Sequence, residues 1–454
     1  MNNDANKKHS SNKHRWIGWL VGTGAVLLLA AWGATLVLPL PAKKESHVTF
    51  NQQNIERGAY LARVGDCVAC HSKTGAPEFA GGAPILSPIG GMVPPNITPD
   101  LQYGIGKYTY GEFARALRHG VARDGTTLYP SMPWPSYRNI AESDMQALYA
   151  YFMKGVPAVA QASPANSIPW PLSIRWPLTY WRWLFGPTVP EPLPEPPSGG
   201  IALGAYYVEG LGHCGACHTP RNALTMNEKA LSNNQNGLVY LSGGQVIDGY
   251  ATPSLRGEVS SGLGNIKPQA LIGVLKSGHH GSMATFGPMS EVVVNSTQYM
   301  TDADLAAMAD YLKSLAPYRE ESPSYYDGGN TFKLLSQRKF TTPGAELYQK
   351  NCAACHLANG LGSANRYPAL ALNPATMNPD ASGLIQIVLA GSHQAATQDN
   401  QAVRYFMPSY ATRLYDQEIA NTLTFIRSSW GNKASAVIAS QVSAARENLP
   451  AKKD

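Results

Sequence analysis

The sequence predicts a mainly α-helical protein in which three tandem domains follow an N-terminal transmembrane helix. Four observations lead to this prediction. The pattern Cys-x-x-Cys-His occurs three times at similar intervals and accounts for all six cysteines of the 454-residue chain. Apolar residues at helical spacing precede and follow each copy of the pattern. An uncharged apolar run occupies residues 16–40, and the chain length itself suggests about three domains of roughly 150 residues each.

The apolar run at residues 16–40 follows a polar, basic N-terminus at residues 1–15. An uncharged run of more than about 20 residues can cross a bilayer core of about 30 Å as a helix. A cleaved signal segment is the alternative, but its apolar part is normally shorter and ends at a small-residue cleavage site. Here the run ends in Leu38-Pro39-Leu40-Pro41, which favours a retained anchor. The basic N-terminus then lies in the cytoplasm, and the domains lie on the periplasmic side of the cell inner membrane.

The three copies of the pattern divide the remaining sequence. We expect domains at residues 51–160, 198–318 and 341–432, each with a helix before its cysteines and a closing helix at its end. A linker rich in proline and tryptophan at residues 161–197, a shorter linker at 319–340 and a weakly patterned tail at 433–454 complete the chain.

Cys-x-x-Cys-His is the attachment signature of a c-type haem. Two thiols on one helical turn reach two neighbouring vinyl groups of the porphyrin, and the next residue then lies under the iron. The sequence therefore predicts three haem c groups, and three tandem class I cytochrome c domains to hold them. The predicted thioether residues are Cys67, Cys70, Cys214, Cys217, Cys352 and Cys355, and the predicted axial ligands are His71, His218 and His356.

Two other uses of cysteine fit the sequence less well. A structural zinc site needs four ligands, usually from two cysteine pairs close in sequence, whereas each pair here stands alone with its histidine. Disulfide scaffolds are short and dense in cysteine, and six cysteines in 454 residues are sparse.

The second axial ligand of each iron decides between electron transfer and chemistry on a small molecule. Each domain offers a methionine beside a proline shortly before its closing helix, and we expect Met132, Met289 and Met407 to be these ligands. Met92 and Met283 are rival methionines, and bis-histidine ligation is also conceivable. The histidines between the pattern and the methionine are His119, His279, His280 and His393.

The ring of a ligating histidine is usually fixed by a hydrogen bond from its other nitrogen. Each domain carries a proline loop at a comparable place. We therefore expect the backbone carbonyls of Pro95, Pro253 and Pro368 to accept this bond.

Composition and motifs narrow the function. The net charge of +6 is modest and gathers at the chain ends, so nothing indicates nucleic-acid binding. The sequence has no nucleophile motif, phosphate-binding glycine loop or dinucleotide fingerprint, which favours electron transfer without a catalytic site of its own. A multihaem peroxidase-like enzyme and a cytochrome c donor to a terminal oxidase are the alternatives.

Several stretches carry a resemblance to a known family. These are Pro94–Asp100, the block from Val208 to Asn222 around the second pattern, Gly287–Val293, and Met407-Pro408 with the later stretch Ile426–Gly431. Over residues of about 51 to 432 the chain resembles the triple-haem cytochrome c subunits of membrane-bound bacterial dehydrogenases that oxidise alcohols, gluconate, fructose or aldehydes.

The resemblance implies a role for the chain within a complex. It implies that electrons pass through the haems from a large catalytic dehydrogenase subunit to ubiquinone, and it allows a small third subunit. It also supports Met132, Met289 and Met407 as iron ligands. The retained apolar run departs from the alcohol-dehydrogenase members, so an aldehyde dehydrogenase partner stays open.

Overall fold

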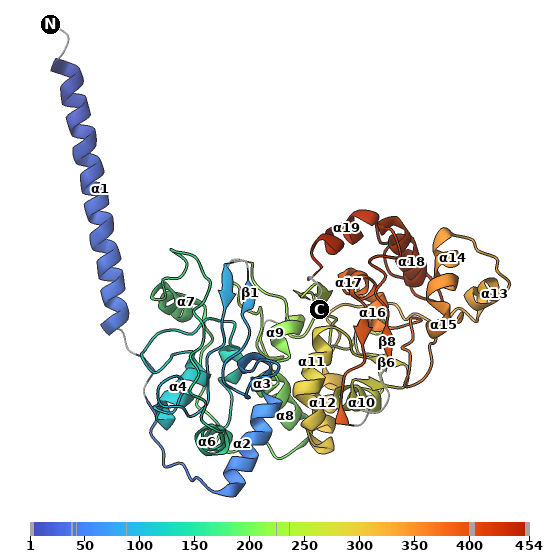
Figure 1. Cartoon of the computed structure of the whole chain (residues 1–454), viewed down its shortest axis with the longest axis horizontal. Helices are drawn as coiled ribbons and strands as arrows, with labels where there is room; N and C mark the ends of the chain where they lie inside the picture. The colour runs from blue at the N-terminus through green and yellow to red at the C-terminus, as the bar shows by residue number, and fades with distance from the viewer. Residues whose placement is uncertain are drawn as a thin grey trace.

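The computed structural model describes residues 4–37, 40–41, 43–87, 89–223, 225–235, 237–398 and 405–449. These residues are mainly helical, as predicted. Their strands form four short two-stranded antiparallel hairpins. We refer to residues 51–160, 198–318 and 341–432 as the first, second and third units. Figure 1 shows a long N-terminal helix that projects from a body in which the units follow one another along the molecule.

Helix α1 (Asp4–Val37) does not match the predicted transmembrane helix at residues 16–40. Within the described residues, no helix has both the length and the apolar character needed to cross a bilayer, so this prediction was wrong. The helix begins in polar sequence, and its apolar part is diluted by glycine and threonine, as at Gly22-Thr23-Gly24. Residues 38 and 39 of the predicted run lie outside the described residues.

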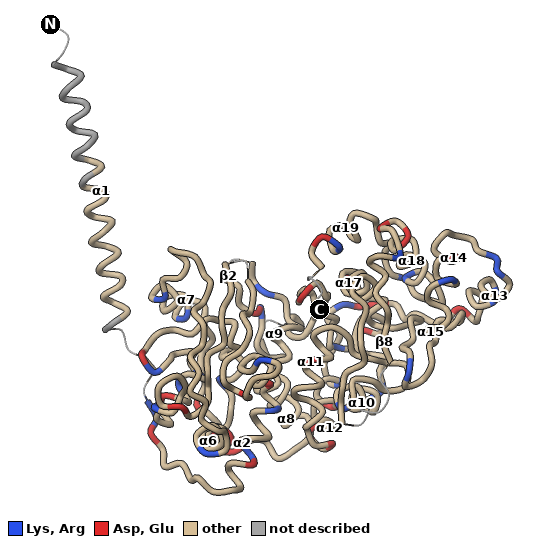
Figure 2. The backbone as a smooth tube through the Cα atoms, viewed as in Figure 1, with Lys and Arg blue, Asp and Glu red and all other residues tan. Residues whose placement is uncertain are grey.

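The C-terminal part of α1 contacts α7 (Pro177–Phe185), which belongs to the proline-rich linker. The Tyr180 hydroxyl donates to the carbonyl oxygen of Ala31 at 2.7 Å. In Figure 2 the part of the α1 tube that is not grey is tan throughout, and acidic and basic residues are interspersed over the body. The large side chains Trp16 and Trp19 are 71% and 72% exposed.

The first unit contains the helices α2 (Gln52–Val64), α3 (Cys67–His71), α4 (Tyr110–His119), α5 (Trp134–Tyr137) and α6 (Glu142–Ala150), and the hairpin β1 (Ile85–Ser87) and β2 (Gly90–Met92). The second unit begins with α8 (Gly200–Ala205), which continues as a wider helical turn at Tyr206–Leu211. Its other helices are α9 (Gly215–His218), α10 (Pro268–Ser277), α11 (Pro288–Asn295) and α12 (Asp302–Ser314). It has two hairpins, one of β3 (Val246–Ile247) and β4 (Tyr250–Ala251) and one of β5 (His279–His280) and β6 (Met283–Ala284).

The third unit contains α14 (Pro343–Asn351), α15 (Ala353–His356), α16 (Pro374–Met377), α17 (Ser382–Ala390) and α18 (Asp416–Ser428), with the hairpin β7 (Ser392–His393) and β8 (Phe406–Met407). Helix α13 (Asn330–Ser336) precedes this unit, and α19 (Ala439–Glu447) follows it.

One helix crossing is repeated in all three units. The first helix packs against the closing helix, in the pairs α2 with α6, α8 with α12, and α14 with α18. A glycine lies at each crossing, and a Cβ atom there would come within 2.0 to 2.1 Å of a carbonyl oxygen of the opposite helix. The three glycines and the residues that they face are Gly58 and Ala147, Gly204 and Ala307, and Gly344 and Asn421. The crossing needs glycine because the two backbones touch.

The units do not form three separate cores. One hydrophobic cluster includes Leu61 and Leu148 of the first unit together with Val208 and Leu305 of the second. A second cluster is confined to the C-terminal part of the chain and includes Trp430. The first two units therefore fold around shared apolar contacts, whereas the sequence predicts complete domains in tandem.

Candidate haem-binding sites

Each Cys-x-x-Cys-His pattern forms a short helix just after the first helix of its unit. These helices are α3, α9 and α15, and the chain turns sharply before α3 and α9. Asp66 and His213, which precede the first cysteine in those two units, have left-handed backbone angles with φ of 51° and 34°. The turn ends the preceding helix and starts the short helix that carries the pattern.

The first cysteine of each pattern is buried. Burial raises the pKa of the Cys67, Cys214 and Cys352 thiols to about 12, so these three thiols are neutral near pH 7. Among the described residues, no group of three or more His, Cys, Asp or Glu side chains could hold a metal ion. Buried neutral thiols agree with cysteines that are used for covalent attachment.

All three histidines make the contact that the repeated prolines predict. The Nδ1 atom of His71 donates to the carbonyl oxygen of Pro95 at 2.7 Å. The corresponding bonds, from His218 to Pro253 and from His356 to Pro368, are both 2.9 Å long. Since a carbonyl oxygen can only accept, Nδ1 carries the proton and Nε2 keeps the lone pair that an iron ligand needs.

Burial also affects the protonation of these imidazoles. It lowers the pKa of all three histidines, and the bond to the proline carbonyl offsets part of this effect. The rings are therefore held neutral, in one tautomer and one orientation. Their role as iron ligands remains a prediction that this geometry supports.

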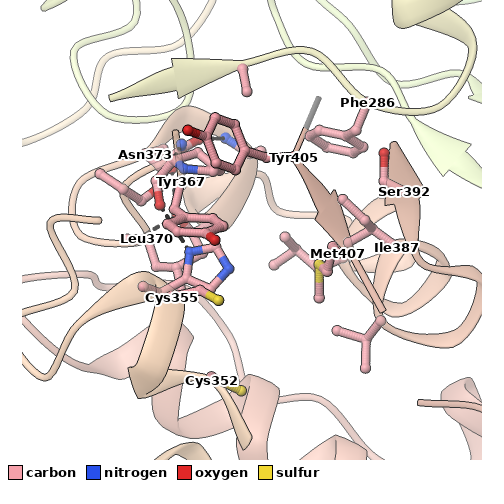
Figure 3. Close-up of a pocket in the computed structure, with 18 of the residues that line it drawn as sticks. Phe286, Cys352, Cys355, Tyr367, Leu370, Asn373, Ile387, Ser392, Tyr405 and Met407 are labelled. Carbon is pink, nitrogen blue, oxygen red and sulfur yellow. Dashed lines mark hydrogen bonds between the residues drawn. The ribbon is translucent and has the colours of Figure 1, made fainter. Parts of the chain in front are cut away.

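The third unit shows how such a site is enclosed. Cys352, Cys355, His356 and Met407 line one cavity. In Figure 3, Met407 lies across open space from Cys352 and Cys355, and its sulfur points into that space. Most of the remaining wall is apolar and includes Leu370 and Ile387. Two thiols, an imidazole and a thioether around an apolar cavity are the groups that a covalently attached haem requires.

The predicted methionines lie in three different local structures. Met407 is in strand β8 and lines the cavity of the third unit, which we call the third cavity. Met132 is partly buried against the core shared by the first two units, and Met289 lies in the first turn of α11, which packs against α3 of the first unit. The cavity of the third unit therefore brings Met407 together with the histidine and the cysteines of the same unit. The assignments of Met132 and Met289 remain predictions.

The rival ligands are placed as follows. Met283 and His279 belong to the second unit but line the cavity of the third. His393 lies in the same wall. Met92 lies in the β1–β2 hairpin. His119 ends α4, where burial and the nearby Arg182 lower its pKa to about 4. The positions of His279 and His393 agree with polar groups near the edge of the third site.

Part of the wall of the third cavity carries no sequence motif. Phe286, Tyr367 and Tyr405 line this cavity, and Phe286 comes from the second unit. A local pattern could not reveal this wall, because it combines two units that are far apart in the sequence.

Comparison with known proteins identifies one segment of the chain as a cytochrome c domain. The cytochrome c family model matches residues 341–430. It finds this one segment, which contradicts the prediction of three tandem class I domains. The first two units keep the attachment pattern and the helix crossing, and they share a core.

Several relatives are similar over most of the chain. The cytochrome c subunit of alcohol dehydrogenase (quinone) from Komagataeibacter europaeus is 46% identical over 85% of this chain and 82% of its own. The gluconate 2-dehydrogenase cytochrome c subunit from Pantoea cypripedii is 46% identical over 86% of this chain and 88% of its own. The fructose dehydrogenase cytochrome subunit from Gluconobacter japonicus is 35% identical over 93% of this chain and 87% of its own. The chain therefore belongs to the family of cytochrome c subunits of dehydrogenases, and its role is electron transfer rather than catalysis on a substrate.

Proposed function

We propose that this chain binds three haem c groups and passes electrons from a large catalytic dehydrogenase subunit, specific for an alcohol or an aldehyde, to ubiquinone. The observation that carries the proposal is the threefold repetition of one local arrangement. In each unit a Cys-x-x-Cys-His helix is followed by a proline whose carbonyl accepts the histidine Nδ1 proton. The same unit also has a glycine at its helix crossing. Repetition of the whole arrangement supports one haem for each unit.

The acceptor and partners are proposed from the relatives. The names of the alcohol dehydrogenase relatives specify a quinone, and ubiquinone is the proposed acceptor here. A small third subunit would complete the complex. Because ubiquinone is dissolved in the bilayer, we place the complex at the cell inner membrane, with the haem units on its periplasmic side.

The residues of the chain have distinct roles in this proposal. Haem c, when bound, supplies an iron that gains and loses one electron. The paired cysteines fix the porphyrin edge by thioether bonds, and the proline carbonyls orient the histidine rings so that Nε2 faces the iron. The thioether of Met407, across the cavity of the third unit from the cysteines, would occupy the second axial position of the iron. The apolar wall excludes water, which favours the reduced state.

The proposal is tested by purification of the native complex under mild conditions, followed by rapid mixing. A large dehydrogenase subunit should copurify, and the substrate-reduced haems should be reoxidised by a soluble ubiquinone analogue. Fast binding of carbon monoxide at one reduced haem, with peroxide turnover by the isolated chain, would instead indicate a peroxidase-like enzyme and contradict the proposal.

A further inference from the structure

The β5–β6 hairpin belongs to the second unit but is bonded to the third. The carbonyl oxygen of Gly281, at the tip of this hairpin, accepts the backbone N–H of Asn365 at 2.6 Å. In return, the Gly281 N–H donates to the side-chain Oδ1 of Asn365 at 2.7 Å. The next residue, Ser282, accepts the N–H of Ala369 at 2.9 Å. Three hydrogen bonds thus join a two-residue turn to one loop of the third unit.

That loop orients the third histidine. Ala369 directly follows Pro368, whose carbonyl oxygen accepts the Nδ1 proton of His356. A displacement of the loop would therefore move the acceptor that sets the direction of the imidazole ring. The turn of the second unit holds this acceptor from the outside.

The same hairpin also closes the third cavity. Met283, Ala284, Thr285 and Phe286 contribute to the wall that contains Cys352, His356 and Met407. Figure 3 shows Phe286 on the side of the cavity where Met407 and Ser392 lie. The third unit therefore does not enclose its own site, because part of the wall comes from the second unit.

The hairpin is continuous with the segment that carries Met289, the predicted iron ligand of the second unit. Helix α11 starts at Pro288, and the hydroxyl groups of Thr285 and Ser290 are 3.1 Å apart. One stretch, residues 279–290, thus borders the third site and carries a predicted ligand of the second. At the equivalent place in the first unit, Val121 pairs with Thr127. There the guanidinium of Arg175, from the linker, donates to the carbonyl oxygen of Thr127.

We propose that Asn365 and Gly281 act as positioning residues that complete the third haem site across the boundary between two units. This inference rests on the proposed function, because it assumes a haem in the third unit. Without the contact, water reaches the third site and the loop that bears Pro368 loosens. Water stabilises the more highly charged ferric state, so the midpoint potential of that haem falls while the other two are unaffected.

The test uses the full-length protein loaded with haem and three variants. Asn365 has a left-handed backbone with φ of 59°, and Asn365→Gly removes the side-chain acceptor without strain at this position. The matched control is Asn359→Gly, because the Oδ1 atom of Asn359 accepts the N–H of the nearby Leu361 within the third unit.

Potentiometric titration followed by haem absorbance is the main readout. In Asn365→Gly one midpoint should shift downward, and this should be the midpoint that Met407→Ala also shifts, whereas Asn359→Gly should resemble the unchanged protein. Three unaltered midpoints in a folded Asn365→Gly variant would overturn the proposal, as would an equal shift in Asn359→Gly. The haem content of the unchanged protein is measured before any variant is made. Fewer than three haems for each chain would overturn the proposed function instead.

A second measurement does not depend on any substitution. In the unchanged protein, the amide hydrogens of Gly281, Asn365 and Ala369 should exchange slowly with deuterium, because each is bonded across the boundary between the units. Exchange of all three at the rate of exposed amides would contradict the contact itself.

Discussion

Arg57 and Asp144 form a two-point ion pair across the first unit, with Arg57 Nε and Nη2 each 2.9 Å from a different carboxylate oxygen. The Asp144 side chain is 3% exposed, and it also accepts the hydroxyl of Tyr206 from the second unit at 2.9 Å. The ion pair therefore lies at the junction where the first two units share their core.

Removal of Arg57 should destabilise this junction. Arg57→Ala leaves a buried carboxylate with Tyr206 as its remaining side-chain donor, and loss of one partner of a buried pair costs about 3 to 5 kcal/mol of unfolding free energy. Denaturant unfolding monitored by far-UV circular dichroism measures this cost. The control is Lys350→Ala, whose exposed pair with Glu346 is worth about 0 to 1 kcal/mol. Equal stabilities of the two variants would contradict the structural role of Arg57.

Glu228 should make stability depend on pH. Burial raises the pKa of Glu228 to about 7, although Arg221 and Arg138 oppose this shift, and its enclosed Oε2 has no hydrogen-bond partner among the described residues. Since the folded pKa exceeds the ordinary value of 4.5, the folded state binds the extra proton. Its contribution to stability is present below about pH 4.5 and is lost as the pH rises to about 7.

The Glu228→Gln variant removes this titration. Relative to the unchanged protein, it should gain stability between pH 5 and pH 8 by an amount on the order of 3 kcal/mol. Thermal unfolding at several pH values measures the difference, with Glu78→Gln as a control because Glu78 is in a half-exposed pair with Arg63. Parallel pH profiles for Glu228→Gln and the unchanged protein would show that Glu228 is already charged in the fold.

Local features of the sites could be predicted from the sequence, whereas contacts between units could not. The three histidine contacts followed from prolines at equivalent places in a repeated pattern, and all three are present. The shared core around Leu61 and Val208 and the Gly281 contact with Asn365 depend on how separate segments meet, which no local spacing encodes. The apolar run at residues 16–40 is long enough to predict a membrane span, but its glycines lower the apolar character of α1.

Met407 should set the potential of one haem. A thioether ligand favours the ferrous state, so Met407→Ala should lower one midpoint potential, leave the other two unchanged and slow the reduction of quinone. Potentiometry is the measurement. The control is Met377→Leu, because Met377 is buried in the third unit but its sulfur accepts the backbone N–H of Lys433. Unchanged potentials in Met407→Ala would refute its assignment as a ligand.

The second unit offers a choice between two methionines. Met283 lines the third cavity, whereas Met289 begins the helix α11 that packs against the first unit. Met289→Leu should therefore abolish the near-infrared charge-transfer band of one methionine–iron bond, and Met283→Leu should preserve it. The reverse result would make Met283 the ligand and would require the β5–β6 hairpin to turn toward the second site.

The central claim is that each unit holds one covalently bound haem. Mass spectrometry of the denatured, full-length protein from cells that attach haem c tests it most directly, because only thioether-linked porphyrin remains on the unfolded chain. We predict a mass increase of three haem groups, with peptides modified at Cys67 and Cys70, Cys214 and Cys217, and Cys352 and Cys355. A chain that carries two haems or fewer would contradict this account.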